Sequence, residues 1–236
     1  METDLLIVTV TKVETTSVFE VFRAATGRDA NPIPIGDKTY HDLGTVNGTR
    51  TCLVQSEMGA GGLGSALQTV QKGIEALAPD AVVMVGIAFG VNDKKQAIGD
   101  ILVARQLIPY DFQKVSTKKS DKGVVDNVIL RDDRPHCSPW LFDIFRSAEL
   151  YWKGQTVHVG PVLTGEKLID NLGFRNELLE LAPEAIGGEM EGRGLYVTCQ
   201  DKKVDWILVK AISDWGDGNK SRNKKKYQEL AGRNAA

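Results

Sequence analysis

Apolar runs and amphipathic stretches alternate along the chain and predict a succession of strands and helices. The β-rich runs cover residues 5–10, 51–55, 81–91, 157–165 and 206–213. Apolar residues at helical spacing follow at residues 18–22, 65–77 and 139–152. We therefore predict one α/β domain over residues 1–236, with a mixed, mostly parallel central sheet that helices cover on both faces.

Three segments qualify this picture. Residues 30–48 are rich in Pro, Gly, Asp and Asn, so they predict loops around a hairpin. Residues 114–134 are polar and basic without an apolar period, which predicts a surface excursion. The helix predicted at 139–152 carries Trp140, Leu141, Ile144 and Trp152 on one face, and we expect that face to be core.

Acidic residues interrupt two apolar segments late in the chain. Glu189 and Glu191 flank Met190, so an extended backbone would place both carboxylates on one side of the chain. Asp214 ends the apolar run 206–213, and an acid at the carboxyl end of a parallel strand faces the crevice where α/β sheets bind ligands. The structural alternative is that the two glutamates begin a helix and Asp214 caps a turn.

Glu14 and a glycine-rich loop stand at two further strand ends. Glu14 begins the first predicted helix, where it either faces a ligand or only favours the helix dipole. Residues 59–64 satisfy the G-x-G-x-x-G spacing, but Asp80 precedes the next strand and Asp93 comes too late to complete a dinucleotide-binding unit. We interpret the glycines as allowing a substrate or a packed element to approach the backbone.

Composition limits the partners. The net charge of −2 argues against a nucleic-acid-binding surface spread over the protein. Residues 1–4 are acidic and only seven apolar or threonine residues follow, so we predict no secretory signal, no membrane partner and a cytoplasmic location. Three dispersed cysteines and three dispersed histidines predict neither a disulfide framework nor a metal site, and we expect no cofactor.

Two motifs carry a resemblance to a known family. Glu-Met-Glu-Gly at 189–192 and a strand ending Ala-Ile-Ser-Asp at 211–214 resemble the nucleoside phosphorylase/nucleosidase superfamily, which includes the methylthioadenosine/S-adenosylhomocysteine nucleosidases. The resemblance extends from Leu5 to about Asp217, and the loop 86–90 is similar to effector domains of multidomain defence proteins. It implies a homo-oligomeric purine nucleosidase. The early end of the last helix indicates a domain excised from a longer protein or a terminus that a partner completes.

The resemblance also implies roles for individual residues. Glu14 would activate the attacking water, Asp214 would protonate the departing purine, and Glu191 would bind the ribose hydroxyls. Leu168 and Ile169 stand where the family places an aromatic residue against the purine, so they form an apolar slot. The other implied substrate contacts are Glu189, Met190, Ser213, Ala88 and Phe89.

The prediction of whether the substrate carries phosphate is based on two segments. Ile87 replaces a serine of the nucleosidases, and the phosphate-binding serine and arginine of the phosphorylases are missing, so residues 87–89 would offer an anion only backbone N–H groups. Arg131 and Arg134 are candidate phosphate contacts. We predict hydrolysis of an adenine nucleotide such as ATP, or of a nucleoside. The alternatives are a methylthioadenosine/adenosylhomocysteine nucleosidase, a purine nucleoside phosphorylase and a nucleotide-sensing module without turnover.

Overall fold

The computed structural model describes residues 3–120 and 123–236, so Met1 and Glu2 of the acidic start and residues 121–122 of the polar excursion lie outside it. Its strands are β1 (Leu5–Thr9), β2 (Asn31–Ile35), β3 (Lys38–Val46), β4 (Thr49–Gln55), β5 (Ala81–Gly90), β6 (Ile101–Pro109), β7 (Gln113–Ser120), β8 (Gly123–Leu130), β9 (Val157–Thr164), β10 (Gly187–Glu189) and β11 (Asp205–Asp214). Its helices are α1 (Lys12–Thr26), α2 (Ala66–Leu77), α3 (Pro139–Glu149), α4 (Leu172–Leu181), α5 (Gly192–Lys202) and α6 (Lys224–Ala235).

Nine strands form one mixed sheet in the order β10-β9-β6-β11-β5-β1-β4-β3-β2. The central strands β11, β5, β1 and β4 are parallel to one another, whereas β6 pairs antiparallel with β11, and β3 pairs antiparallel with both β4 and β2. Because β10 pairs with β9 and also with the end of β5, five strands close into a ring at one side of the sheet. The predicted α/β domain with a mixed, mostly parallel sheet is confirmed.

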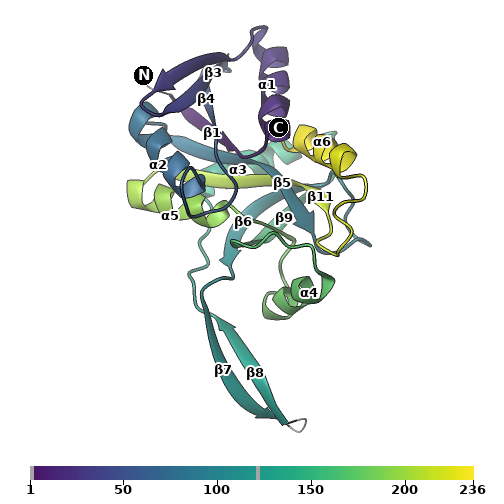
Figure 1. Ribbon diagram of the computed structural model, residues 1–236. Helices are drawn as coiled ribbons and strands as arrows, with labels where there is room; N and C mark the ends of the chain where they lie inside the picture. The colour runs from purple at the N-terminus through teal and green to yellow at the C-terminus, as the bar shows by residue number, and fades with distance from the viewer. Residues whose placement is uncertain (1–2, 121–122) are drawn as a thin grey trace.

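Helices cover both faces of the sheet, which explains why its central strands are apolar on both sides. Helix α2 packs with α5 on one face, and α1 packs with α6 on the other (Figure 1). Leu6 of β1 faces α2, where a Cβ added at Gly73 would lie 2.5 Å from its Cδ2. Thr9 has the opposite parity and shares a hydrogen bond with Thr15 of α1.

Helix α1 begins at a capping box. Thr11 is the N-cap, and its Oγ1 accepts a hydrogen bond from the Glu14 backbone N–H at 3.3 Å. In return, Glu14 Oε2 accepts one from the Thr11 backbone N–H at 2.6 Å. The cap follows β1 directly, so Glu14 lies at the carboxyl edge of the sheet, and Gly27 ends the helix with a φ of 70°.

The polar segment 114–134 contains more structure than its sequence predicts. It forms the two-stranded antiparallel hairpin β7–β8, which projects from the body of the domain (Figure 1). Apolar side chains of the hairpin such as Val115, Val124 and Ile129 are exposed. Backbone pairing therefore holds the strands, and these exposed apolar side chains impose no period on the sequence.

The prediction that the apolar face of 139–152 is core is largely wrong. Leu141 is buried and Phe145 packs partly against the core, but Trp140, Ile144 and Trp152 are about half exposed. Helical spacing shows that one face of α3 is apolar, whereas what covers that face depends on elements far away in the sequence.

Within the described ranges, no helix has both the length and the hydropathy needed to cross a membrane.

Candidate active site

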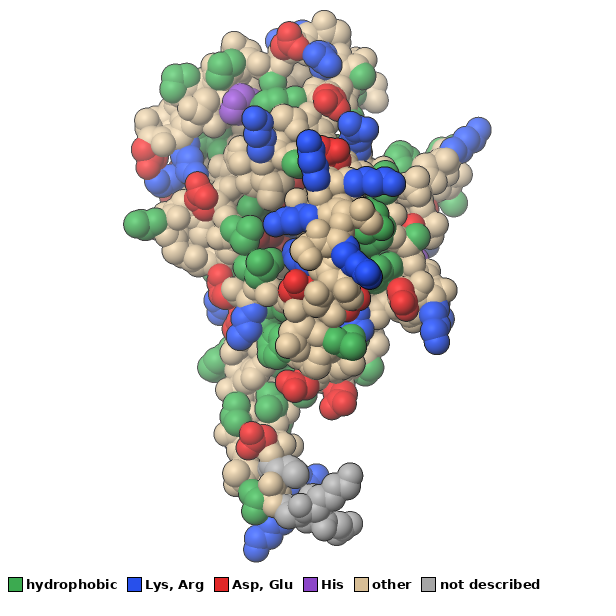
Figure 2. All heavy atoms as spheres, turned by 45° about the vertical axis from the view of Figure 1, so that its right-hand side comes forward, with side chains coloured by type: hydrophobic (Ala, Val, Ile, Leu, Met, Phe, Trp, Pro, Cys, Tyr) green, Lys and Arg blue, Asp and Glu red, His purple; other side chains and the backbone are tan. Residues whose placement is uncertain are grey.

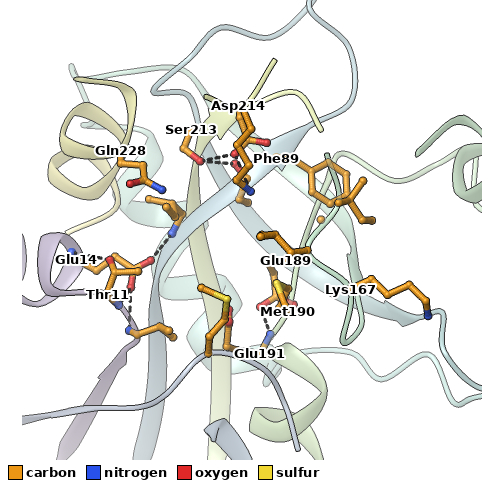
Figure 3. A pocket seen from close by; sticks show the side chains of 18 of the residues that line it. Thr11, Glu14, Phe89, Lys167, Glu189, Met190, Glu191, Ser213, Asp214 and Gln228 are labelled. Atoms are coloured by element: carbon orange, nitrogen blue, oxygen red, sulfur yellow. Dashed lines mark hydrogen bonds and ion pairs between the residues drawn. The ribbon is translucent and has the colours of Figure 1, made fainter. Parts of the chain in front are cut away.

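A pocket opens at the carboxyl ends of β1, β5 and β11, where α1, β10 and α6 meet (Figure 3). This is the edge at which α/β sheets bind ligands. Ten of the twelve predicted site residues line it. The lining residues are Val10, Thr11, Glu14, Met58, Ile87, Ala88, Phe89, Lys167, Leu168, Ile169, Gly188, Glu189, Met190, Glu191, Ser213, Asp214, Lys220, Lys224 and Gln228.

Ser213 and Asp214 both face the pocket because β11 is irregular at its end. Ile212 pairs with Ala88 of β5 and Asp214 pairs with Phe89, which leaves Ser213 without a partner in the register. Consecutive side chains of a regular strand point to opposite faces, whereas a bulge re-aims one of them. The bulge therefore places a hydroxyl and a carboxyl group in one cavity.

Three groups hold the buried Asp214 carboxylate. Ser213 Oγ donates to Oδ2 over 2.9 Å, and the Gly216 backbone N–H donates to Oδ1 over 3.1 Å. Lys220 Nζ forms an ion pair with Oδ2 at 3.3 Å. The carboxyl group is thus fixed in orientation and has a proton-bearing ammonium group beside it.

Glu189 and Glu191 flank a strand-to-helix turn. Glu189 ends β10, and its carboxylate accepts hydrogen bonds of 2.9–3.0 Å from the backbone N–H groups of Glu191 and Gly192. Glu191 is the N-cap of α5, with φ −117° and ψ −23°. The backbone is therefore not extended at Glu191, so the two carboxylates are not placed by the alternation of a strand. The helix-start alternative describes the Glu189 carboxylate, which binds the first free N–H groups of α5.

Lys210 lies beneath the pocket among three buried acidic side chains. Its Nζ is 3.0 Å from Glu191 Oε2 and 3.7 Å from Glu189 Oε2. The carboxylate of Glu14 approaches from the α1 side: a Cβ added at Gly86 would lie 2.6 Å from Glu14 Oε1 and 3.0 Å from Lys210 Nζ. Glycine at position 86 leaves the space that these two charged groups occupy.

Burial and mutual charge set the protonation of this cluster. Burial raises the pKa of Glu14 and of Glu189, an effect that the Lys210 charge opposes. For Lys210, burial acts to lower the pKa, but the charges of Glu191, Glu189 and Glu14 outweigh it and leave the pKa above its ordinary value. The ammonium group is therefore charged throughout the neutral range, whereas Glu14 and Glu189 ionise less readily than exposed glutamates.

Glu14 is held by three backbone N–H groups. Its Oε2 accepts from Val10 at 2.8 Å and from Thr11 at 2.6 Å, and its Oε1 accepts from Ile87 at 3.0 Å. The Ile87 N–H is one of the groups expected to form an anion site at residues 87–89. In the structure, this N–H group already donates its hydrogen bond to the Glu14 carboxylate.

An apolar slot separates the acidic groups. Phe89 and Ile169 are buried in its wall, while Leu168 is 57% and Met58 is 54% exposed at the rim. Phe89 lies beside Asp214, and Met190 lies beside Glu191 (Figure 3). A flat ring system with hydrogen-bonding edges matches an apolar wall bordered by a few polar groups.

Arg131 and Arg134 are not brought to this pocket. Arg134 forms an ion pair with Glu184 at 2.6 Å, and Arg131 is exposed beyond the end of β8. Neither residue is among the lining residues of the pocket, and between them Asp132 binds Arg193 of α5 at 3.0 Å. The basic residues that do line the pocket are Lys167, Lys220 and Lys224.

Basic side chains are concentrated on one part of the surface although the chain as a whole carries a net charge of −2. Several Lys and Arg side chains gather on the upper part of the face seen in Figure 2, to which α6 contributes. Lys220 and Lys224 border the pocket from this side. An anionic ligand is thus attracted to the region around the pocket more than the net charge indicates.

Lys210 is the main site residue that the sequence analysis missed. A signal was available, because Lys210 is the one charged residue inside the run 206–213. A buried lysine without a partner is very unfavourable, so a lysine inside a buried strand implies nearby carboxylates.

The cysteines and His158 lie apart from the pocket lining. Cys52, Cys137 and Cys199 are buried free thiols, and His158 Nε2 lies 2.8 Å from Asp100 Oδ2. Within residues 3–120 and 123–236, no group of three or more His, Cys, Asp or Glu side chains is arranged to hold a metal ion.

A sequence model of the phosphorylase superfamily matches residues 27–236, which is most of the chain. The chain belongs to the phosphorylase superfamily. The matched range contains Glu189, Glu191, Lys210 and Asp214 but begins after Glu14.

Relatives within the phosphorylase superfamily include two kinds of nucleosidase. The death domain-containing ATP nucleosidase of Amphimedon queenslandica is 26% identical over 237 residues, which cover 91% of this chain and 44% of the relative. The 5'-methylthioadenosine/S-adenosylhomocysteine nucleosidase of Haemophilus influenzae (strain PittGG) is 28% identical over 197 residues, covering 82% of this chain and 80% of the relative. The chain therefore spans less than half the length of the first relative.

Solved structures share the fold of this superfamily member. The 5'-methylthioadenosine/S-adenosylhomocysteine nucleosidase of Neisseria meningitidis in complex with methylthio-immucillin-A has a TM-score of 0.80 at 18% identity, covering 99% of this chain and 95% of that one. The futalosine hydrolase of Helicobacter pylori has a TM-score of 0.78 at 22% identity, covering 99% and 94%. The likeness extends over the whole α/β fold.

Replacing Lys210 by Met should destabilise the protein, because three buried carboxylates lose their cation. Removing one partner of a buried ion pair costs about 3–5 kcal/mol of unfolding free energy. The substitution raises the folded-state pKa values of Glu14 and Glu189 further, so the deficit should grow as the pH rises through them and shrink in acid. Chemical denaturation at about pH 5 and pH 8 measures both effects.

Lys225→Met is the matched control, because the Lys225 side chain is 90% exposed and its contact with Glu229 is 4.0 Å long. It should change the unfolding free energy by less than about 0.5 kcal/mol. A Lys210→Met deficit as small as that of the control, and equal at both pH values, would contradict the assigned role of Lys210.

Proposed function

We propose that this chain is a purine nucleosidase that hydrolyses the N-glycosidic bond of an adenine nucleotide, with ATP as the favoured substrate, and releases adenine. The observation that carries the proposal is the placement of Glu14, Glu191 and Asp214 around one apolar slot. The nucleosidases among the relatives support the reaction class, and the ATP nucleosidase supports a nucleotide substrate. The likeness of the 86–90 loop to defence effectors supports a role in antiviral defence, and we propose that the enzyme is cytoplasmic and homo-oligomeric.

The base end of the pocket is assigned to the slot beside Asp214. Phe89 and Ile169 supply the apolar wall for the purine, and the Asp214 carboxyl group lies at its edge. Protonation of a ring nitrogen makes the purine a better leaving group. Asp214 would deliver this proton, and Lys220, 3.3 Å away, is placed to return one to the same carboxyl group.

The ribose is assigned to Glu191 and Met190, with Glu14 across the pocket. Glu191 can accept one ribose hydroxyl on each carboxylate oxygen, beside the Lys210 ammonium group on Oε2 and the Gly59 N–H on Oε1. The carboxylates of Glu14 and Glu191 also stabilise the positive charge that develops on the sugar. Because burial raises the pKa of Glu14, this carboxylate is a stronger base toward the attacking water than an exposed glutamate.

Hydrolysis is favoured over phosphorolysis by the surroundings of Ile87. Its backbone N–H, which an incoming phosphate would need, already binds Glu14. The serine and arginine expected in a phosphorylase are absent from residues 86–90. An inorganic phosphate at this position would meet a carboxylate, and like charges at contact distance repel.

A methylthioadenosine/adenosylhomocysteine nucleosidase is the second candidate function. The exposed apolar side chains of Met58 and Leu168 at the rim of the pocket would suit a thioether substituent. A sensing module without turnover is disfavoured, because recognition alone does not require Glu14, Glu191 and Asp214 together.

Adenine release separates these candidates. The protein is incubated with ATP, AMP, adenosine or methylthioadenosine, with and without phosphate, and free adenine is measured by chromatography. We expect the highest kcat/KM for ATP, no stimulation by phosphate, and incorporation of oxygen from labelled water into the sugar. A requirement for phosphate would identify a phosphorylase, a preference for methylthioadenosine the second candidate, and tight nucleotide binding without adenine a sensing module.

Asp214→Asn should lower kcat by about 10²–10⁴ while substrate affinity stays within about tenfold, because the amide keeps the shape but delivers no proton. Lys220→Met leaves the acid in place and should lower kcat less. Asp201→Asn, on the exposed side of α5, is the control for the loss of one carboxylate. If Asp214→Asn keeps more than about a tenth of the activity, Asp214 is not the acid.

The pH profile tests Glu14. The base must be ionised, so log kcat/KM should fall as the pH decreases through the Glu14 pKa, and burial places that pKa above the ordinary glutamate value. Glu14→Gln should lower kcat by at least about 10² and abolish this acidic limb. A limb that persists in the variant would assign it to another group.

A further inference from the structure

The glycine-rich loop at residues 59–64 borders the pocket and binds carboxylates of the chain itself. The Gly59 backbone N–H donates to Glu191 Oε1 at 3.2 Å. The next two N–H groups, of Ala60 and Gly61, donate to Oε2 and Oε1 of Glu166 at 3.2 and 2.9 Å. Both carboxylate oxygens of Glu166 thus lie on consecutive N–H groups of the loop, an arrangement that binds anions.

Gly59 allows this close approach. Its φ of +94° lies in the region that favours glycine, and a Cβ there would lie 2.9 Å from Glu166 Oε2. A side chain at position 59 would therefore be strained and would also displace the carboxylate. The loop is shaped to bring a negatively charged oxygen against its backbone.

The backbone of Glu166 is anchored, whereas its side chain is exposed. The Glu166 backbone N–H donates to Asp111 Oδ2 at 2.7 Å, and Lys167 Nζ binds Asp111 Oδ1 at 2.8 Å. These bonds do not involve the Glu166 carboxylate. The carboxylate can leave the loop while the backbone that precedes Leu168 stays in place.

The loop lies at the ribose end of the proposed substrate. Gly59 shares the Glu191 carboxylate with Lys210, and Met58, which precedes Gly59, lines the pocket. Lys220 pairs with Asp214 and therefore belongs to the base end. In the proposed pose, phosphates attached to C5′ would extend away from the base end, which leaves the loop within the region that they can reach.

We propose that Glu166 is a specificity-determining residue whose carboxylate occupies the place of a substrate phosphate; this rests on the proposed function. With no phosphate present, Glu166 satisfies the Ala60 and Gly61 N–H groups. A nucleotide displaces the carboxylate and binds the same groups through a phosphate oxygen. Because the displacement opposes binding, a substrate with several charged oxygens overcomes it more readily than one with few.

The test is Glu166→Gln, which keeps the shape of the side chain and removes its charge. A neutral amide competes less well with phosphate for the two N–H groups, so kcat/KM for ATP should rise by about tenfold. The value for adenosine should stay within about twofold, because adenosine does not displace the side chain. Glu166→Ala should change the ratio in the same direction, and Glu57→Gln, an exposed acid of the same loop region, should leave it unchanged.

A second measurement does not depend on turnover. Inorganic triphosphate is titrated calorimetrically into the wild type and Glu166→Gln, and the variant should bind it about tenfold more tightly. Equal changes for ATP and adenosine, or unchanged triphosphate binding, would overturn the role of Glu166. Absence of adenine from every substrate would instead refute the nucleosidase proposal, and the titration would still decide on Glu166.

Discussion

The positive charge of Lys210 is the interaction on which the arrangement of acidic groups depends. Glu14, Glu189 and Glu191 come from the start of α1, the end of β10 and the start of α5, and all three are buried. Carboxylates at such short separations repel one another unless a cation lies among them or protons neutralise them. Lys210 supplies that cation from β11, the strand that also ends in Asp214. One strand therefore positions both the counter-ion of the groups proposed to bind the sugar and the acid proposed for the base.

Local backbone features hold each acidic group in place. A capping box orients Glu14, the first N–H groups of α5 hold Glu189, and a bulge turns Asp214 toward the pocket. Each feature lies at the end of an element that is itself packed into the sheet. The carboxyl groups are therefore preorganised, which is the condition under which fixed charges stabilise a developing cation most effectively.

The two ends of the pocket bind negative charge through different groups. At the base end, Lys220 presents an ammonium group on a flexible side chain. At the ribose end, the loop presents backbone N–H groups in a fixed geometry, and Glu166 already fills two of them. A mobile cation attracts anions over a distance. A fixed pair of N–H groups instead discriminates between anions by their shape and by how readily they displace the Glu166 carboxylate. Attraction of a nucleotide and discrimination between substrates of different charge would thus reside in different parts of one pocket.

The sequence by itself determined the α/β class, the order of the main strands and the residues that end them. Buried parallel strands are continuous apolar runs, so a polar residue at the end of one, such as Asp214 or Glu14 after β1, is visible without a structure. Tertiary structure alone decided what surrounds those residues. Two contacts join segments far apart in the chain: Lys210 pairs with Glu191, and Glu166 binds the backbone of the glycine-rich loop. Trp140 is about half exposed because no distant element among the described residues covers the rest of it. Such contacts arise when the sheet closes, and local periodicity records only which face of an element is apolar, not which partner meets it.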